Sequence, residues 1–237
     1  MAKVAPVDPE TILADHGLLQ AFDEATRRRI AAQAGPRRVE AGKVIFQRGD
    51  PGDSMIAVAR GQVKISTYSQ DGKELVLNII RTGEVFGEIG LLDGEPRTAD
   101  AAALVTCDLL VLKRETFLSH LEANPEVTRR LLGILCQRLR RTSAHLEDSL
   151  FLEAPARLAR ALSHLVGAFG IPARAGVCID VKLSQQQLGA IVGITRESVN
   201  KHLGAWQKAG WIAIRNGYIT VVDADALAAL AGREPEV

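Results

Sequence analysis

Six glycines recur at intervals of about 11 residues between positions 42 and 94, and this spacing constrains the fold more than any other feature of the sequence. Short runs rich in apolar and β-branched residues lie between them: Lys43–Gln47, Ser54–Arg60, Gln62–Tyr68, Glu74–Ile80, Ala99–Val105 and Asp108–Lys113. Regular short strands separated by turn signals are typical of a β-sandwich or barrel. The sequence therefore predicts a closed β-roll whose mouth can hold a small ligand.

A helix is predicted to cover this roll on its N-terminal side. Leu18–Ala34 carries apolar residues at helical spacing and is followed by Gly35-Pro36, which we interpret as a stop signal. Residues 1–16 include two prolines and little periodicity, and we expect them to form a loosely ordered lead-in.

The stretch Phe86–Ala99 interrupts the strand pattern with residues of poor β propensity. Gly87 and Gly90 allow backbone N–H groups to approach a ligand closely. A short turn of helix over 88–92, which includes Ile89, would direct further N–H groups at negative charge. This stretch is therefore a candidate anion site inserted into the roll.

Three side chains refine that interpretation. Arg97 adds a permanently charged planar guanidinium, and Thr98 adds a hydroxyl. Glu88 would repel an anion unless it accepts a hydrogen bond from another group, such as a sugar hydroxyl. An anion together with a hydroxyl indicates a sugar phosphate, although an arginine behind a Gly-Glu turn also occurs as a solvated loop with a surface ion pair.

A long helix is predicted to begin at Asn124-Pro125, with asparagine as N-cap and proline in the first turn. Its apolar seam alternates steps of three and four, with one polar member, and Leu131 and Leu150 widen it: Leu132, Leu135, Leu139, Thr142 and Leu146. Such a seam of about 25 residues favours a two-stranded coiled coil and hence a dimer. The alternative is a single helix packed on its own barrel.

After a hinge at residues 152–155, a short helix over Ala156–Phe169 is predicted to end at Gly170-Ile171-Pro172, and a half-buried strand to follow at Val177–Leu183. Ser184 and Gln187 then form a capping box, which opens a helix to Val192. A turn at Gly193 leads to a second helix, capped by Thr195 and reaching about Ala209.

Two short helices joined by a glycine turn are typical of a helix-turn-helix unit. In the second helix Val199, Leu203 and Trp206 are expected to face inward, opposite a polar face formed by Glu197, Asn200, Lys201, Gly204 and Lys208. A polar helix face is often only solvated. Here a hairpin with Asn216-Gly217 at its turn follows at the position of a wing, which favours DNA binding. A short alanine-rich helix and a tail end the chain.

These motifs resemble those of the cyclic-AMP receptor protein family of bacterial transcription regulators. Phe86–Ala99 is similar to the family's phosphate-binding cassette, and Ile194–Val199 is similar to its recognition helix. Thr142-Ser143 resembles the pair that holds adenine, one residue from each subunit. The ligand site implied by the resemblance comprises Gly87, Glu88, Ile89, Gly90, Arg97, Thr98, Thr142 and Ser143.

The resemblance also implies a DNA-binding set: Ser184, Gln186, Thr195, Arg196, Glu197, Ser198, Asn200 and Lys201. Arginine is bidentate to guanine, and glutamate accepts from the cytosine amino group, so Arg196 and Glu197 are the expected base readers. Two positions depart from the family pattern. Lys201 stands where the family has a second base-reading arginine, and Gln185 stands where it has a phosphate-contacting arginine.

Composition limits the other possibilities. The net charge of +1 indicates that nucleic-acid binding must come from a local patch. The three cysteines suit free thiols in a reducing compartment, and none precedes Cys107, unlike the iron–sulfur branch of the superfamily. The five histidines show neither metal-ligand nor catalytic spacing, so we expect no metal and no enzyme. No apolar run reaches the roughly 18 residues of a membrane span, which indicates a cytoplasmic protein.

The sequence thus predicts an α+β protein in three parts: a cyclic-nucleotide-binding β-roll over 1–123, a dimerisation helix over 124–152 and a winged helix-turn-helix domain over 153–237. We expect a homodimer that binds a two-fold DNA operator in response to cAMP and contacts RNA polymerase, without a membrane partner. The alternatives are cGMP or both nucleotides as effector, or ligand-independent DNA binding with a vestigial pocket. An enzyme that carries such a domain as its regulator is disfavoured, because no catalytic constellation is present.

Overall fold

The computed structural model describes residues 17–232, so the predicted lead-in at 1–16 lies outside the described residues. Residue contacts divide the described chain into two units, 17–67 with 76–140 and 68–75 with 141–232. Within this part of the chain, no helix is long and apolar enough to span a bilayer.

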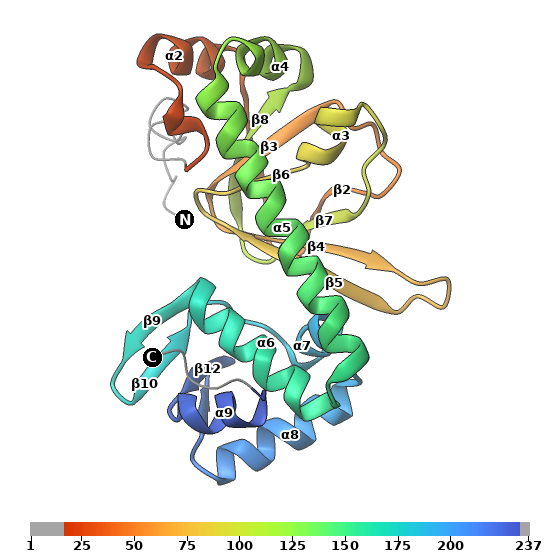
Figure 1. The fold of residues 1–237 in the computed structure, drawn as a ribbon, viewed down its shortest axis with the longest axis vertical. Helices are drawn as coiled ribbons and strands as arrows, with labels where there is room; N and C mark the ends of the chain where they lie inside the picture. The colour runs from red at the N-terminus through yellow and green to blue at the C-terminus, as the bar shows by residue number, and fades with distance from the viewer. Residues whose placement is uncertain (1–16, 233–237) are drawn as a thin grey trace. The chain divides into compact units, whose positions relative to one another are not determined.

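The first unit is built on a β-roll of two four-stranded sheets (Figure 1). One sheet has the order β1 (Gly35–Val39), β8 (Cys107–Lys113), β3 (Ser54–Arg60) and β6 (Val85–Phe86). The other has the order β2 (Val44–Phe46), β7 (Asp100–Ala103), β4 (Gln62–Tyr68) and β5 (Glu74–Arg81).

Strand β3 is apolar on both faces because the first sheet is covered on both sides. Met55 and Ala57 pack in the core cluster formed with the helices, whereas Ile56 and Val58 pack in the cluster between the two sheets. This arrangement explains why β3 is a continuous apolar run rather than an alternating one.

All six strands predicted for the roll are present, but two further strands of the roll, β1 and β6, were not predicted. The helix does end before Gly35-Pro36, as predicted. The same two residues also open β1, which pairs antiparallel with β8. Strand β6 pairs with β3 through only two residues. Such short or edge strands carry little periodicity of their own.

The prediction of a single helix over Leu18–Ala34 is also wrong, because the helical conformation is interrupted before Asp23. A 3-10 turn, η1 (Leu19–Ala21), precedes helix α2 (Glu24–Gln33). Asp23 caps α2 by accepting hydrogen bonds from the Thr26 N–H and hydroxyl, both at 2.8 Å, and these bonds lower the pKa of its carboxyl.

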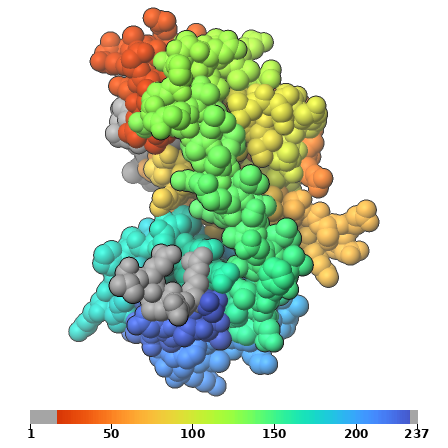
Figure 2. Space-filling view, viewed as in Figure 1, coloured from red at the N-terminus to blue at the C-terminus, as the bar shows by residue number. Residues whose placement is uncertain are grey.

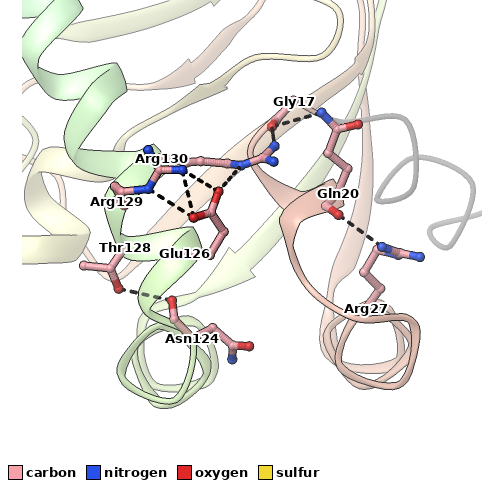
Figure 3. Close-up of polar contacts among 8 residues, drawn as sticks. All are labelled: Gly17, Gln20, Arg27, Asn124, Glu126, Thr128, Arg129 and Arg130. Carbon is pink, nitrogen blue, oxygen red and sulfur yellow. Dashed lines mark hydrogen bonds and ion pairs between the residues drawn. The ribbon is translucent and has the colours of Figure 1, made fainter.

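Helix α2 packs beside α4 (Arg114–Glu122), where the Phe22 and Phe117 rings meet edge to face with centroids 6.3 Å apart. The start of the long helix α5 (Pro125–Phe151) is tied to the same end of the unit (Figure 3). Glu126 pairs with Arg129 and Arg130, and Arg130 donates to the Gly17 carbonyl at 3.3 Å.

Helix α5 begins at Pro125 as predicted, and the Asn124 side-chain amide donates to the His120 carbonyl at 2.6 Å. Val127 and Leu131 are buried against the roll, so the prediction that Leu131 widens the exposed seam was wrong. Figure 2 shows α5, in green, at the surface. Four leucines of α5 remain more than half exposed, at 56% to 68%: Leu132, Leu139, Leu146 and Leu150.

The second unit continues from α5 with α6 (Ala154–Phe169) and contains the sheet β11-β12-β10-β9. Its other elements, in chain order, are β9 (Gly170–Ala173), β10 (Gly176–Ile179), α7 (Gln185–Val192), α8 (Arg196–Lys208), β11 (Ile212–Arg215), β12 (Tyr218–Val221) and α9 (Ala224–Leu230).

Helix α6 ends at Phe169, so Gly170-Ile171-Pro172 stops the helix as predicted. The same residues begin strand β9, which was not predicted and which pairs with β10. The strand predicted over Val177–Leu183 ends at Ile179. The predicted hairpin is present between β11 and β12, where Asn216 and Gly217 adopt positive φ values of 53° and 83°. Together with the roll, this unit confirms the predicted α+β class.

Candidate functional site

The predicted anion site follows β6 and is built around helix α3 (Glu88–Asp93), which confirms the expected turn of helix. Gly87 before α3 and Gly94 after it have φ values of 77° and 80°, which glycine adopts without strain. Beneath the helix, a Cβ on Gly52 would lie 2.1 Å from the Glu95 carbonyl oxygen and 2.7 Å from the Gly90 Cα. Two glycines therefore let the loop before β3 cross directly against α3.

Arg97 lies beneath this helix and is only 5% exposed. Its Nη1 donates to the carbonyls of Ser54 at 2.6 Å and Gly87 at 2.7 Å, and its Nη2 donates to the Ser54 hydroxyl at 2.8 Å. Its guanidinium carbon stands 4.4 Å from the centroid of the Phe46 ring. One edge of the guanidinium is thus fixed by the protein itself.

The other edge is not satisfied. The Nε of Arg97 is buried and has no hydrogen-bond partner within residues 17–232. Burial lowers the pKa of the Arg97 guanidinium, and the charges of Asp53, Asp50 and Glu88 oppose this shift. A buried N–H without an acceptor costs about 1–3 kcal/mol, so this edge would be stabilised by an anionic oxygen if the protein atoms that cover Nε move aside. Gly87 is required here, because a Cβ on it would lie 2.5 Å from the Arg97 Nη1.

Glu88 is 1% exposed and forms an ion pair with Arg138, which comes from α5. Arg138 also donates to the carbonyl of Val85, the residue that opens β6. The sequence did not predict this pair. Arg138 precedes Thr142 by one helical turn in an arginine-rich run, and nothing in that run distinguishes it from Arg140 or Arg141.

The remaining predicted ligand residues differ in exposure. Gly90 is buried against Gly52, whereas Ile89 and Thr98 are exposed. Thr142 and Ser143 are exposed on the part of α5 that belongs to the second unit. Ser54, Phe46 and Gly52 were missed by the sequence analysis, although Gly52 stands out as a glycine directly before β3.

The predicted helix-turn-helix is formed by α7 and α8. Ser184 and Gln187 make both hydrogen bonds of the capping box, and Thr195 accepts from the Ser198 N–H at 3.2 Å. Val199, Leu203 and Trp206 are buried as predicted. Hydrogen bonds from its own N–H and from the Thr195 hydroxyl lower the pKa of Glu197, which therefore stays an ionised acceptor.

The polar face of this motif is at the surface. Its exposed members among the predicted DNA-binding residues are Ser184, Gln186, Thr195, Arg196, Glu197, Asn200 and Lys201, while Ser198 is half-buried. Gln185 lies beside them and donates from its Nε2 to the Asn200 Oδ1 at 3.1 Å, which joins the first turn of α7 to α8. The structure therefore brings the predicted DNA-binding residues of the two helices together. Across residues 17–232, no three side chains of the types that ligate metals converge.

Two domain families match the chain. Residues 36–124 match the cyclic nucleotide-binding domain, and residues 156–230 match the Crp-like helix-turn-helix domain. Over 219 residues the chain is 31% identical to a CRP-like cAMP-activated global transcriptional regulator of Mycobacterium tuberculosis, covering 92% of this chain and 98% of that protein.

Two further proteins show a similar likeness. A global nitrogen regulator of Synechococcus elongatus is 32% identical over 215 residues, which cover 90% of this chain and 96% of that protein. Among solved structures, the c-di-GMP-responsive global regulator CLP of Xanthomonas campestris has a TM-score of 0.71 and 27% identity, covering 84% of this chain and 99% of that chain.

Proposed function

The chain belongs to the cyclic-AMP receptor protein (CRP) family of transcription regulators, and from this premise we propose that it binds DNA as a homodimer in response to cAMP. The family is one of regulators rather than enzymes. In the proposed division of the chain, residues 1–123 bind the nucleotide, 124–152 form the dimer and 153–237 bind DNA. Such a regulator would act in the cytoplasm and would contact RNA polymerase at the promoter.

The observation that carries the effector proposal is the half-satisfied guanidinium of Arg97. Nη1 and Nη2 are held by Ser54 and Gly87, which fixes the plane of the group, while Nε still lacks an acceptor. A cyclic phosphodiester carries two non-bridging oxygens and one negative charge, and one of these oxygens would accept the Nε hydrogen once the protein atoms that cover Nε move aside. The N–H groups at the start of α3 would add donors for the phosphate.

Glu88 gives the site its expected preference for a nucleotide over inorganic phosphate. Its carboxylate is buried close to the charge of Arg97 and is held by Arg138. A carboxylate so placed can accept from a ribose 2′-hydroxyl while its own charge remains compensated. Thr142 and Ser143 would then contact the purine. The effector cAMP is proposed over cGMP because the similar regulator of Mycobacterium tuberculosis is described as cAMP-activated.

The homodimer proposal is supported by the exposed leucines of α5. A soluble monomer seldom exposes a continuous stripe of leucines, and three of these, Leu132, Leu139 and Leu146, repeat every seven residues. In a dimer joined along this stripe, a two-fold axis would relate the two copies of α8. They would then read half-sites about 34 Å apart, one turn of DNA.

Calorimetric titration of the purified protein with cAMP, cGMP and cyclic di-GMP tests the effector. We expect saturable binding of cAMP with one site per chain. Arg97→Gln should weaken it about ten- to a hundred-fold, since a charge-assisted hydrogen bond contributes about 1.5–3 kcal/mol. The matched control is Arg48→Gln, which removes the same charge from an exposed position in the same unit. Equal affinities for the two variants would remove the phosphate role of Arg97.

Ligand-independent DNA binding is the second candidate, and one observation favours it. Glu88 is already paired with Arg138, and most of the hydrogen-bonding capacity of Arg97 is met by the protein. A nucleotide-dependent mobility-shift assay on random-sequence duplex DNA separates the two candidates. Equal retention of DNA with and without each nucleotide would support the second candidate and contradict the first.

A further inference from the structure

Arg157 lies in α6 beside the helix-turn-helix, and its guanidinium has no internal partner. Within residues 17–232 its side chain makes no hydrogen bond or ion pair, and its Nε is buried without an acceptor. Its Nη1 lies 4.0 Å from where a Cβ on Gly193 would stand. Gly193 is the left-handed residue that ends α7, two residues before the N-cap of α8.

Arg160, one turn further along α6, also has a buried Nε without an acceptor in the described part of the chain, but its Nη1 and Nη2 both have partners. Arg160 forms an ion pair with Asp148 and donates to the Ala231 carbonyl at 3.1 Å. Half-buried cations are normally paired in this way, because removing a charge from water without a counterion is costly. The charge of Arg157 therefore has no counterion among the described residues of the second unit. The side chain lies beside Gly193, where the turn from α7 to α8 begins.

We infer that Arg157 contacts a DNA phosphate, and this inference rests on the proposed DNA-binding function. Phosphates are the anions that surround a helix inserted into the major groove. The sequence gives an independent reason to expect another cation here. Gln185, in the first turn of α7, supplies no charge and instead hydrogen-bonds Asn200. Arg157, which belongs to α6, would supply the missing positive charge beside Gly193, at the other end of α7 from Gln185.

The test is the salt dependence of DNA binding by the full-length protein, measured by fluorescence anisotropy between about 50 and 200 mM salt. The probes are a duplex selected from a random library and a scrambled duplex of equal length. Each phosphate contact contributes about 0.9 to the slope of log K against log salt. We therefore expect Arg157→Gln to reduce the slope by about 2 for a dimer, equally on both duplexes. Arg157→Lys should keep the slope, because it keeps the charge.

The control is Arg174→Gln, which removes an exposed charge between β9 and β10 of the same unit and should leave the slope unchanged. Cyclic nucleotide titration and thermal unfolding of each variant serve as checks on the fold. An unchanged slope in Arg157→Gln, or an equal loss in Arg174→Gln, would overturn the inference while leaving the proposed function standing. If the wild-type protein binds neither duplex, with or without nucleotide, then the proposed function itself fails.

Discussion

Replacing Arg138 should destabilise the first unit far more than replacing its partner Glu88. The Glu88 side chain is 2% exposed and that of Arg138 is 25% exposed. Arg138→Gln leaves a buried carboxylate without its cation, which costs about 3–5 kcal/mol when burial is complete. Glu88→Gln leaves a guanidinium that still reaches water and the Val85 carbonyl, so we expect a loss of only about 1 kcal/mol.

The double variant distinguishes the ion pair from a general packing effect. Arg138→Gln with Glu88→Gln removes both charges, and the two amides can hydrogen-bond each other. We therefore expect its free energy of unfolding to lie within about 1 kcal/mol of that of Glu88→Gln alone. The coupling energy between the two positions should then be about 3–5 kcal/mol and favourable.

The assay can resolve the two units because both tryptophans, Trp206 and Trp211, lie in the second. In urea, tryptophan fluorescence follows the second unit, whereas far-ultraviolet circular dichroism follows both. We expect Arg138→Gln to lower the midpoint of the circular dichroism transition assigned to the first unit and to leave the fluorescence transition unchanged. Equal costs for the two single variants would refute the reasoning, since it depends on their unequal exposure.

Three further outcomes are expected. Gly52→Ala should cost the first unit about 1–3 kcal/mol and weaken nucleotide binding in calorimetry by displacing α3, whereas Gly35→Ala, which meets open space, should change neither. Burial lowers the pKa of His145, so the second unit should be fully stable above about pH 6.5 and lose stability as the pH falls below it. His145→Gln should flatten that dependence in urea titrations followed by fluorescence. Gly204→Ala and Gly167→Ala should each stabilise their helix by about 0.5–1 kcal/mol, since neither Cβ meets a neighbour. Only Gly204→Ala should weaken DNA binding, measured by fluorescence anisotropy, because Gly204 lies on the polar face of α8.

The strands that the sequence predicts well are those with strong local signals. Ser54–Arg60 and Gln62–Tyr68 have the predicted bounds because a turn glycine separates two long β-rich runs. Strand β1 was missed because it opens with Gly-Pro and exposes Arg37 and Arg38. Its pairing depends on β8, more than 60 residues further along the chain. Non-local pairing of this kind leaves no periodic trace in the strand itself.

The candidate site shows the same division. Glu88 and Arg97 were identifiable because an acid and a base within ten residues of two glycines form a local pattern. Their partners Arg138 and Ser54 are brought in by tertiary structure, from α5 and from the start of β3. The sequence identified Gln185 only as a position that lacks the family's arginine and its charge. Its hydrogen bond to Asn200 depends on how α7 and α8 pack.

Arg138 also suggests how a ligand at the proposed anion site could act on helix α5. A ribose hydroxyl that donated to Glu88 would use a carboxylate that α5 already holds, so in the proposed site the nucleotide and α5 would share one acceptor group. If the nucleotide displaced Arg138, it would have to offset the loss of that ion pair and would bind weakly. If it shares Glu88 with Arg138, it favours the positions of α5 that keep Arg138 in reach. A ligand shifts a conformational equilibrium only by its differential affinity for the two states. The Glu88–Arg138 pair is one place where such a difference can arise, and Arg138→Gln should therefore weaken the nucleotide dependence of DNA binding more than DNA binding itself.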